Sequence, residues 1–164
     1  MIHSSSVHIV IDLTLQRLRL ETGGGELIAS YPVSTGLNGA GENDGSGCTP
    51  RGEHYVRASI GSGLPVGTVF RGRRPTGETY SSELAREHPD RDWILSRILW
   101  LCGREWGKNR GPGVDTFRRF IYIHGTPDSE PMGVPLSHGC VRMRNEDIID
   151  LFDRVGPGTA VSIQ

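Results

Sequence analysis

The sequence has little of several features that would each identify a class of protein. Cysteine is scarce: the 164 residues contain only Cys48, Cys102 and Cys140. Such an odd, sparse set is not a disulfide framework, and it leaves at least one free thiol. No apolar run approaches the roughly twenty residues of a membrane-spanning helix. The net charge is only −1, which argues against a protein whose main partner is nucleic acid or an anionic membrane.

A secretory leader is also missing from the first twenty residues. Polar residues interrupt every apolar run in MIHSSSVHIVIDLTLQRLRL, and no cationic segment precedes a continuous apolar one. If Met1 is the native start, we expect a cytoplasmic protein with reduced thiols. A trimmed chain would instead allow a periplasmic location.

Glycine and proline, by contrast, are plentiful. The chain has 23 Gly and 10 Pro, so turns and loops should be abundant, and a coiled coil or another long-helix protein is excluded. The length suits one domain with a sizeable core, and we expect residues 1–164 to form a single domain.

Most of the patterned segments indicate β-structure. Alternating or β-branched apolar residues predict strands at 7–20, 26–33, 54–60, 66–70, 120–123 and 159–163. The glycine-rich turn at 22–25 separates the first two, so we expect an antiparallel pair there.

Two helices are predicted in the second half of the chain. In residues 90–102 an apolar stripe recurs at helical spacing and stops before Gly103. The stripe consists of Trp93, Ile94, Ile98, Leu101 and Cys102. Cys102 should then be a small buried hydrophobe. The second helix follows Asn145, its predicted N-cap. Because strands dominate without βαβ alternation, we expect a mixed, mainly β sandwich or barrel-like domain with one or two helices.

Glycine-rich loops and a basic cluster complete the outline. Residues 34–50 and 104–116 predict loops, and the first is long enough to be mobile or functional. Arg71, Arg73 and Arg74 lie together before a turn. They form either a solvated loop or a site for substrate carboxylates, which arginine binds through two parallel hydrogen bonds.

The segment richest in chemistry runs from His124 to Arg142. His124 leaves the end of an apolar strand, and Cys140 follows Gly139 sixteen positions later, just upstream of a helix. An ordinary thiol is only a few per cent thiolate at neutral pH, so a neighbouring imidazole that takes its proton would activate it. Backbone N–H groups of Gly139 and Cys140 could stabilise an oxyanion. No acidic residue lies nearby, so the carbonyl of Gly125 is a candidate for orienting the imidazole.

Each of these residues has a structural alternative. Cys140 could be a buried thiol and His124 a core histidine that satisfies a hydrogen bond. His138 could be a base, a pocket wall or a support for nearby backbone, and Arg142 a surface cation or a carboxylate ligand. Zinc binding by His124, His138 and Cys140, with Cys48, is a remote alternative, since neither CxxC nor HExxH occurs.

These motifs resemble those of a known family. IHGT at 123–126 and SHGCVRM at 137–143 look like the signature of the YkuD-type L,D-transpeptidase catalytic domain. VIDL at 10–13, YPVSTG at 31–36 and TPRG at 49–52 are similar to its earlier strands and turn. The resemblance spans most of the chain, and it implies a mainly β sandwich with mixed sheets. Residues 78–116 are least typical and are interpreted as a helix-containing insertion flanking the cleft.

The resemblance implies a role for each residue of the segment. Cys140 would be the nucleophile, His124 its base and the Gly125 carbonyl the orienting group. The site would be lined by Ser137, His138, Gly139 and Arg142. Many family members carry Asn where this chain has Arg142, which affects how the substrate is oriented. Trp100 and Trp106 are candidate pocket walls, although core packing suits Trp100 better. No metal or cofactor is implied.

The implied chemistry is acyl transfer on a peptidoglycan stem peptide or muropeptide. The thiolate attacks the carbonyl of the third, L-centred residue of a tetrapeptide stem, D-alanine leaves, and a thioester remains. Water then gives a tripeptide (L,D-carboxypeptidation), whereas an amine gives a 3–3 cross-link or an exchange product. From the missing leader we expect hydrolysis of recycled or precursor muropeptides. A carbapenem should form a covalent adduct on Cys140. A peptidoglycan-binding module with an inert thiol remains an alternative.

Overall fold

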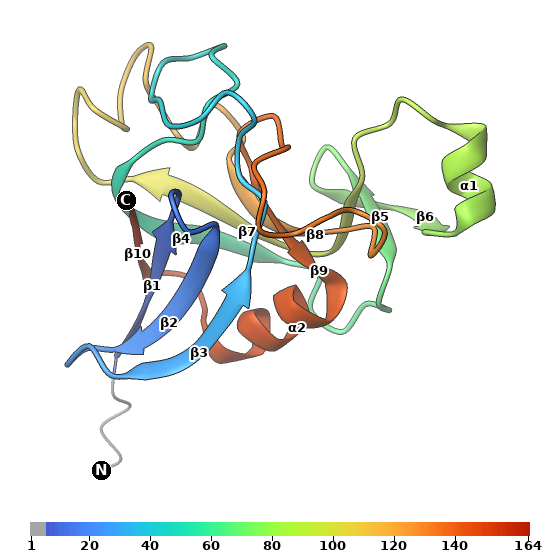
Figure 1. Ribbon diagram of the computed structural model, residues 1–164, viewed down its shortest axis with the longest axis horizontal. Coiled ribbons are helices and arrows are strands. Elements are labelled where there is room, and N and C mark those ends of the chain that lie inside the picture. The colour runs from blue at the N-terminus through green and yellow to red at the C-terminus, as the bar shows by residue number, and fades with distance from the viewer. Residues whose placement is uncertain (1–5) are drawn as a thin grey trace.

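The computed structural model describes residues 6–164 and shows a mainly β protein (Figure 1). Its strands are β1 (Val7–Asp12), β2 (Arg17–Thr22), β3 (Leu27–Pro32), β4 (Gly52–Ile60), β5 (Thr68–Arg71), β6 (Arg74–Thr79), β7 (Ile94–Gly103), β8 (Tyr122–Thr126), β9 (Val141–Arg144) and β10 (Ala160–Ile163). Its helices are α1 (Ser82–Glu87) and α2 (Asn145–Arg154). The predicted class, mainly β with a mixed sheet and one or two helices, is confirmed.

The described strands form one curled sheet. Its order is β3-β2-β1-β10-β4-β7-β5-β6, and β8 adds to β7 and carries β9. The pairs β1–β10 and β8–β9 are parallel, whereas the remaining pairs are antiparallel. Directly after β3, Ser34 exchanges two backbone hydrogen bonds of 2.9 Å with Arg142 of β9. This contact joins the two ends of the sheet, so the early part of the chain reaches the HGC segment.

The prediction of a single strand over 7–20 is wrong. Residues 13–16 form a turn that separates β1 from β2. Gln16 takes a left-handed conformation at φ 52°, a position usually given to glycine or asparagine. The Asp12 carboxylate accepts a hydrogen bond of 2.9 Å from the Leu15 N–H. That side-chain turn at Asp12 is the signal in the sequence for the reversal.

The predicted helix at 90–102 is also wrong, because this segment contains strand β7. A bulge interrupts its pairing with β8 between Leu95 and Ile98, where Ser96 adopts φ 72°. The extra residue breaks the two-residue alternation of a strand, and the resulting spacing imitates a helix. Since β7 pairs with strands on both edges and is covered on both faces, its apolar residues are largely buried. Cys102 is buried, as expected.

The main core lies inside the curl of the sheet and beneath α2. It gathers fully buried side chains from strands at both ends of the chain and from the helix. Among them are Ile9, Leu18, Leu101, Ile123, Val141, Ile148, Leu151 and Val161. The helix prediction after residue 144 is confirmed, but its cap is not Asn145. Arg144 precedes the helix, and Asn145 is its first residue, with a buried side chain.

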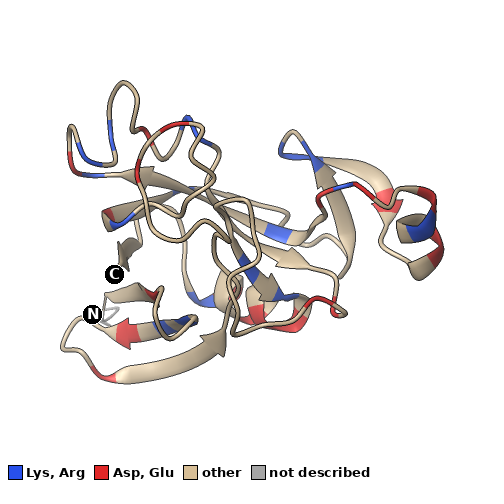
Figure 2. Cartoon of the chain, turned by 45° about the horizontal axis from the view of Figure 1, so that its top comes forward, with Lys and Arg blue, Asp and Glu red and all other residues tan. Residues whose placement is uncertain are grey.

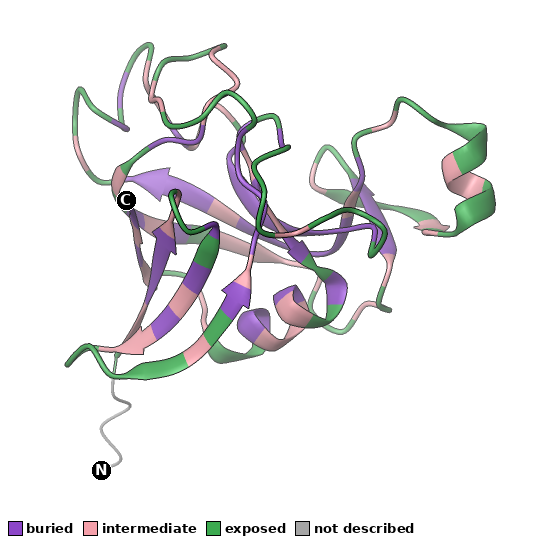
Figure 3. Ribbon diagram, in the orientation of Figure 1, coloured by how far each residue is buried: buried purple, intermediate pink, exposed green. Residues whose placement is uncertain are grey.

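Residues 67–92 project from one side of the sheet as the β5–β6 hairpin and α1 (Figure 1). The short helix has no buried residue, whereas neighbouring β7 and β8 are almost wholly buried (Figure 3). Ser81 caps α1 by accepting a 3.0 Å hydrogen bond from the Leu84 N–H. Among the described residues, no helix is long and apolar enough to cross a membrane.

Candidate functional site

The parallel pair β8–β9 brings the predicted nucleophile and base to one face. Ile123 pairs with Val141 and His124 with Arg142. Ile123 and Val141 point into the main core, so side chains one position away point to the opposite face. Tyr122 and His124 share that face, and Cys140 packs there against Tyr122. The predicted His124 on β8 and Cys140, directly before β9, therefore lie on the same face of the sheet.

Cys140 carries a free, half-buried thiol directly before β9. Its Sγ accepts from the Tyr122 N–H and donates to the Phe120 carbonyl, both at 3.3 Å. Burial raises the pKa of the thiol to about 12, and the Tyr122 N–H opposes this shift only in part. At neutral pH the sulfur is therefore protonated and needs a base before it can act as a nucleophile.

His124 offers such a base. Its imidazole is 1% exposed, and Nδ1 lies 2.6 Å from the carbonyl oxygen of Gly125, the contact expected from the sequence. A carbonyl only accepts, so Nδ1 carries the proton and Nε2 has a free lone pair. Nε2 is buried and has no hydrogen-bond partner among residues 6–164. Burial lowers the pKa of His124, which keeps the imidazole neutral.

There is no room for a side chain at position 125, so only glycine fits there. A Cβ there would lie 2.5 Å from the Leu95 carbonyl oxygen and 2.6 Å from Asn145 Oδ1. The Ser96 hydroxyl donates to Asn145 Oδ1 at 2.6 Å. The Nδ2 amide of Asn145 in turn donates to the Thr126 carbonyl at 3.0 Å. The β7 bulge and the start of α2 thus fix the backbone that carries the orienting carbonyl.

The turn before the nucleophile is built by Ser137 and Gly139. The Ser137 hydroxyl donates to the Cys140 carbonyl at 2.6 Å and accepts from the Gly139 N–H at 3.1 Å. Gly139 has φ 125°, a conformation that favours glycine. Because its N–H is bonded to Ser137, the expected contribution of Gly139 to an oxyanion site does not exist in this arrangement. The N–H of Cys140 remains the candidate.

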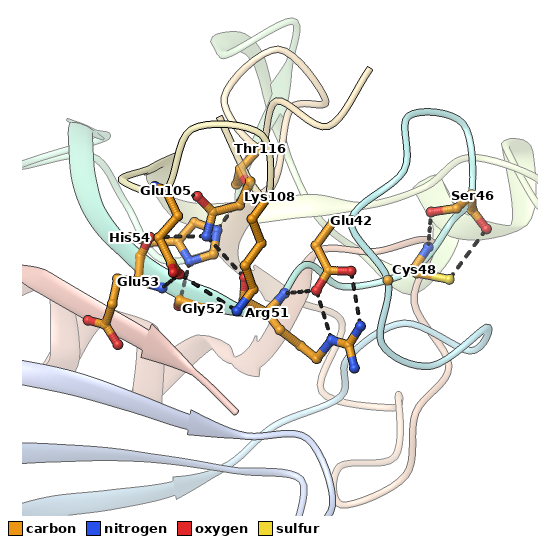
Figure 4. A network of polar contacts seen from close by, with 12 residues as sticks. Glu42, Ser46, Cys48, Arg51, Gly52, Glu53, His54, Glu105, Lys108 and Thr116 are labelled. Carbon is orange, nitrogen blue, oxygen red and sulfur yellow. Dashed lines mark hydrogen bonds and ion pairs between the residues drawn. The ribbon is translucent and has the colours of Figure 1, made fainter. Parts of the chain in front are cut away.

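The loop at 36–52 supports this turn from the other side. Thr49 Oγ1 donates to the Gly139 carbonyl and accepts from the Gly36 N–H, both at 2.9 Å. Figure 4 shows the outer part of the loop, where Arg51 binds Glu42 through two side-chain hydrogen bonds of 2.8 and 3.1 Å. Arg119 donates to the Cys48 carbonyl at 2.6 Å. The TPRG segment therefore positions the residue before the nucleophile.

His138 and Arg142, on either side of Cys140, both lie near Asp92, an acidic residue that the sequence did not point to. Arg142 Nη2 lies 3.3 Å from Asp92 Oδ1, and His138 Nδ1 lies 3.8 Å from Asp92 Oδ2. The His138 side chain is 80% exposed, so it is not a buried support for the backbone. Asp92 precedes β7, about fifty positions from either partner, and no local pattern links them.

An aromatic cluster beside the thiol is only partly predictable from the sequence. Trp100, a suggested wall, stacks on Phe117 at 4.0 Å and meets Tyr122 edge-on at 5.8 Å. Arg73 lies over the rings of Trp100 and Phe120 at 4.9 and 4.7 Å, and it donates to the Tyr122 hydroxyl at 3.1 Å. The arginines at 71–74 therefore divide: Arg73 packs on this cluster, whereas its two neighbours are exposed, at the basic tip of the hairpin (Figure 2).

The cavities near this site and far from it are lined by different residues. A cavity of about 310 Å³ lies beside the turn that precedes the nucleophile and is lined by His138, Phe120, Arg119 and the loop at 44–47. A larger one, of about 620 Å³, lies between the start of β1 and the end of α2 and contains none of the predicted site residues. Within residues 6–164, no cluster of three or more His, Cys, Asp or Glu side chains is arranged to hold a metal ion.

The curled sheet is that of L,D-transpeptidase catalytic domains. L,D-transpeptidase 3 from Mycobacterium tuberculosis, solved with a faropenem-derived adduct, superposes with a TM-score of 0.58 at 18% identity, covering 97% of this chain and 60% of that one. Bd1075 from Bdellovibrio bacteriovorus superposes with a TM-score of 0.59 at 20% identity, covering 98% of this chain and 47% of that one.

The chain belongs to the YkuD family, the L,D-transpeptidase catalytic domain, which matches residues 6–163. Among curated relatives, the probable L,D-transpeptidase YbiS of Escherichia coli K12 is 54% identical over 43 residues. That segment is 26% of this chain and 14% of the relative, so the match covers only a small part of the longer protein.

Proposed function

We propose that this chain cleaves the bond between the third, L-centred residue of a peptidoglycan tetrapeptide stem and the terminal D-alanine, through a thioester on Cys140. The observation that carries the proposal is the pair itself. A buried imidazole with an unpartnered Nε2 among the described residues shares one sheet face with a free thiol. The family match supports the substrate class.

The proton moves during attack rather than before it. Burial disfavours both a thiolate and an imidazolium, so the pKa of Cys140 is raised, that of His124 is lowered, and the resting pair is neutral. His124 Nε2 takes the thiol proton as Cys140 Sγ bonds to the carbonyl carbon of residue three. The Cys140 N–H donates to the developing oxyanion.

Collapse of this intermediate breaks the C–N bond to D-alanine, and the imidazolium of His124 protonates the leaving amine. The acyl group remains on sulfur as a thioester. A second nucleophile, deprotonated by the same Nε2, attacks the thioester carbonyl, and sulfur leaves and recovers the proton. Water yields a tripeptide, whereas an amine yields a new amide bond.

We propose water as the main acceptor. Besides burial, charged groups of both signs affect the thiol: Asp92 raises the pKa of Cys140, whereas Arg142 and Arg119 lower it. Their charges therefore do not select the acceptor. Water needs no binding subsite of its own, whereas an amine acceptor must bring a second stem to the thioester.

The product mixture from a defined disaccharide tetrapeptide tests both the acyl-transfer reaction and the choice of water as acceptor. We expect tripeptide and free D-alanine, with the tripeptide in excess of 3–3 dimer across substrate concentrations. Predominant dimer would contradict water as the acceptor but keep the acyl-transfer reaction. Cys140→Ser should abolish both products, whereas Cys48→Ser, which alters a second half-buried thiol, should retain turnover. Undiminished turnover by Cys140→Ser would refute the mechanism.

The same thiol should be open to acylation. The M. tuberculosis structure carries a faropenem-derived adduct. We expect a carbapenem to add its full mass to the protein and to leave Cys140→Ser unmodified, as read by intact-mass spectrometry. Modification that persists in Cys140→Ser would place the reactive group elsewhere.

A further inference from the structure

A separate aromatic and basic pocket lies two cavities away from His138, the residue two positions before the nucleophile. The cavity at His138 and Phe120 shares Arg118 and Arg119 with a second cavity of about 190 Å³. That cavity shares Pro112, Asp115 and Arg118 with a third, of about 430 Å³. The shared lining residues show that the three cavities are neighbours around the loop at 111–119.

The third cavity, here called the distal pocket, has a composition suited to a ligand. It is lined by Tyr55, Trp106 and Phe117 together with Arg57, Arg110 and Arg118. Trp106 is 77% exposed, which leaves the face of a large aromatic ring open to solvent. An exposed tryptophan in a hollow is more often part of a binding site than of a core.

The cations of the distal pocket are not neutralised by the protein. Among residues 6–164, the guanidinium groups of Arg57, Arg110 and Arg118 form neither a salt bridge nor a side-chain hydrogen bond. Asp115, the acidic residue in the lining, is engaged with the backbone N–H groups of Gly111 and Arg118 at 2.9 and 3.0 Å. Donors with no partner next to aromatic faces suit a polar ligand that also has an apolar face.

A line of aromatic contacts joins the distal pocket to the nucleophile. Phe117 of the distal pocket stacks on Trp100 at 4.0 Å, Trp100 meets Tyr122 at 5.8 Å, and the Tyr122 N–H contacts Cys140 Sγ. A stem whose third residue lies at the sulfur still has two residues and the attached sugar to place, and three residues of extended chain span about 10 Å. The distal pocket is the aromatic and basic site toward which this end of the donor can be directed.

We propose that the distal pocket binds the amino-sugar end of the donor muropeptide, with the sugar stacked on Trp106 and the arginines donating to the hydroxyl and amide oxygens of the sugar. This rests on the proposed function, because it assumes a stem peptide at Cys140. It adds that the enzyme distinguishes sugar-bearing stems from free peptides.

The test compares a disaccharide tetrapeptide with the free tetrapeptide. Titration calorimetry measures the affinity of each for the inactive Cys140→Ala variant, and kcat/KM for each is measured with protein that retains Cys140. We expect the sugar to raise affinity and kcat/KM by about tenfold, which corresponds to about 1.4 kcal/mol. Trp106→Ala and Arg110→Gln should remove this preference without changing kcat/KM for the free tetrapeptide. Trp106→Phe should keep most of it, and Arg86→Gln, which alters an exposed arginine on α1, should keep all of it.

Equal affinity for the two ligands, or no binding of either, overturns the distal pocket as a sugar site. Retention of the preference in Trp106→Ala and Arg110→Gln overturns it as well. Failure of the proposed function is seen separately: it is the absence of turnover of both the disaccharide tetrapeptide and the free tetrapeptide by the wild-type chain.

Discussion

At the scale of single residues, the site depends on a proton that burial keeps on the sulfur. Burial raises the pKa of the Cys140 thiol and lowers that of the His124 imidazole, so the resting pair is neutral. This differs from a preformed thiolate–imidazolium pair, in which a low thiol pKa makes the nucleophile available before substrate binds. The distinction can be measured from the pH dependence of the rate.

We expect kcat/KM to fall on the acid side only below pH 6.5. Catalysis requires neutral His124, and burial lowers its pKa from 6.5, so the loss begins when the pH falls through that lowered value. No alkaline limb should follow a thiol titration below about pH 10, because the pKa of Cys140 is about 12. Initial rates on the free tetrapeptide between about pH 4.5 and 10 provide the check. A rate that rises through about pH 8.5 would indicate a titrating thiol and contradict the neutral pair.

Gly125 allows a second test at this scale. An added Cβ would come within 2.6 Å of the Leu95 carbonyl oxygen and Asn145 Oδ1, neither of which can move freely. We expect Gly125→Ala to lower the free energy of unfolding by about 1–3 kcal/mol and to reduce kcat, since it displaces the carbonyl that orients His124.

Gly156→Ala is the matched control, because nothing lies within 4 Å of the position that its added Cβ would occupy. It should change neither quantity appreciably. Urea unfolding and tetrapeptide turnover of the two variants are compared. Equal stability of both would show that Gly125 is not under steric constraint.

At the scale of elements, the local pattern predicts the residues that carry the chemistry better than it predicts the strand that supports them. His124, Gly125 and Cys140 belong to short, recognisable segments. The sequence of β7 imitates a helix because a bulge at Ser96 disrupts its alternation. At this bulge Ser96 donates a hydrogen bond to Asn145, 49 positions away, and no short stretch of sequence contains both residues.

The same long-range contact explains the error at Asn145. A polar residue before an amphipathic stretch usually caps the helix, but here the side chain is buried and bonded to β7 and β8. Likewise Asp92 and Arg119 reach the site from distant segments, through contacts that depend on the closed sheet. Local chemistry is therefore predictable from short motifs, whereas the supporting contacts require the tertiary structure.

We expect Asn145→Ala to cost about 2 kcal/mol of unfolding free energy, since it leaves the Ser96 hydroxyl and the Thr126 carbonyl without their partner in the interior. Because α2 and β7 meet beside Gly125, turnover should fall as well. Asn43→Ala, at an exposed loop position, is the control. The measurements are chemical denaturation and kcat, and an unchanged midpoint in Asn145→Ala would show that the network adds no stability.

At the scale of the whole molecule, the closed sheet holds its loops through buried polar contacts, and one of them makes stability depend on pH. His54 of β4 is fully buried, with Nδ1 2.9 Å from the Gly52 carbonyl oxygen and Nε2 2.9 Å from Thr116 Oγ1 (Figure 4). It joins the strand that follows the 36–52 loop to the loop at 104–120, which carries the distal pocket. Burial lowers the pKa of His54 from 6.5 to about 4.

The sign of the pH effect follows from proton binding. Between pH 6.5 and about 4 the unfolded chain protonates this imidazole and the folded chain does not, so acidification favours unfolding. His54 should therefore contribute a loss of about 3 kcal/mol of stability between about pH 7 and pH 4, at about 1.36 kcal/mol for each unit of pKa difference. His54→Gln removes the titration, and its unfolding free energy should fall less over this range than that of the wild type. Urea denaturation of both proteins at about pH 7, 5.5 and 4 measures the difference, and parallel losses would mean that His54 is not the titrating group.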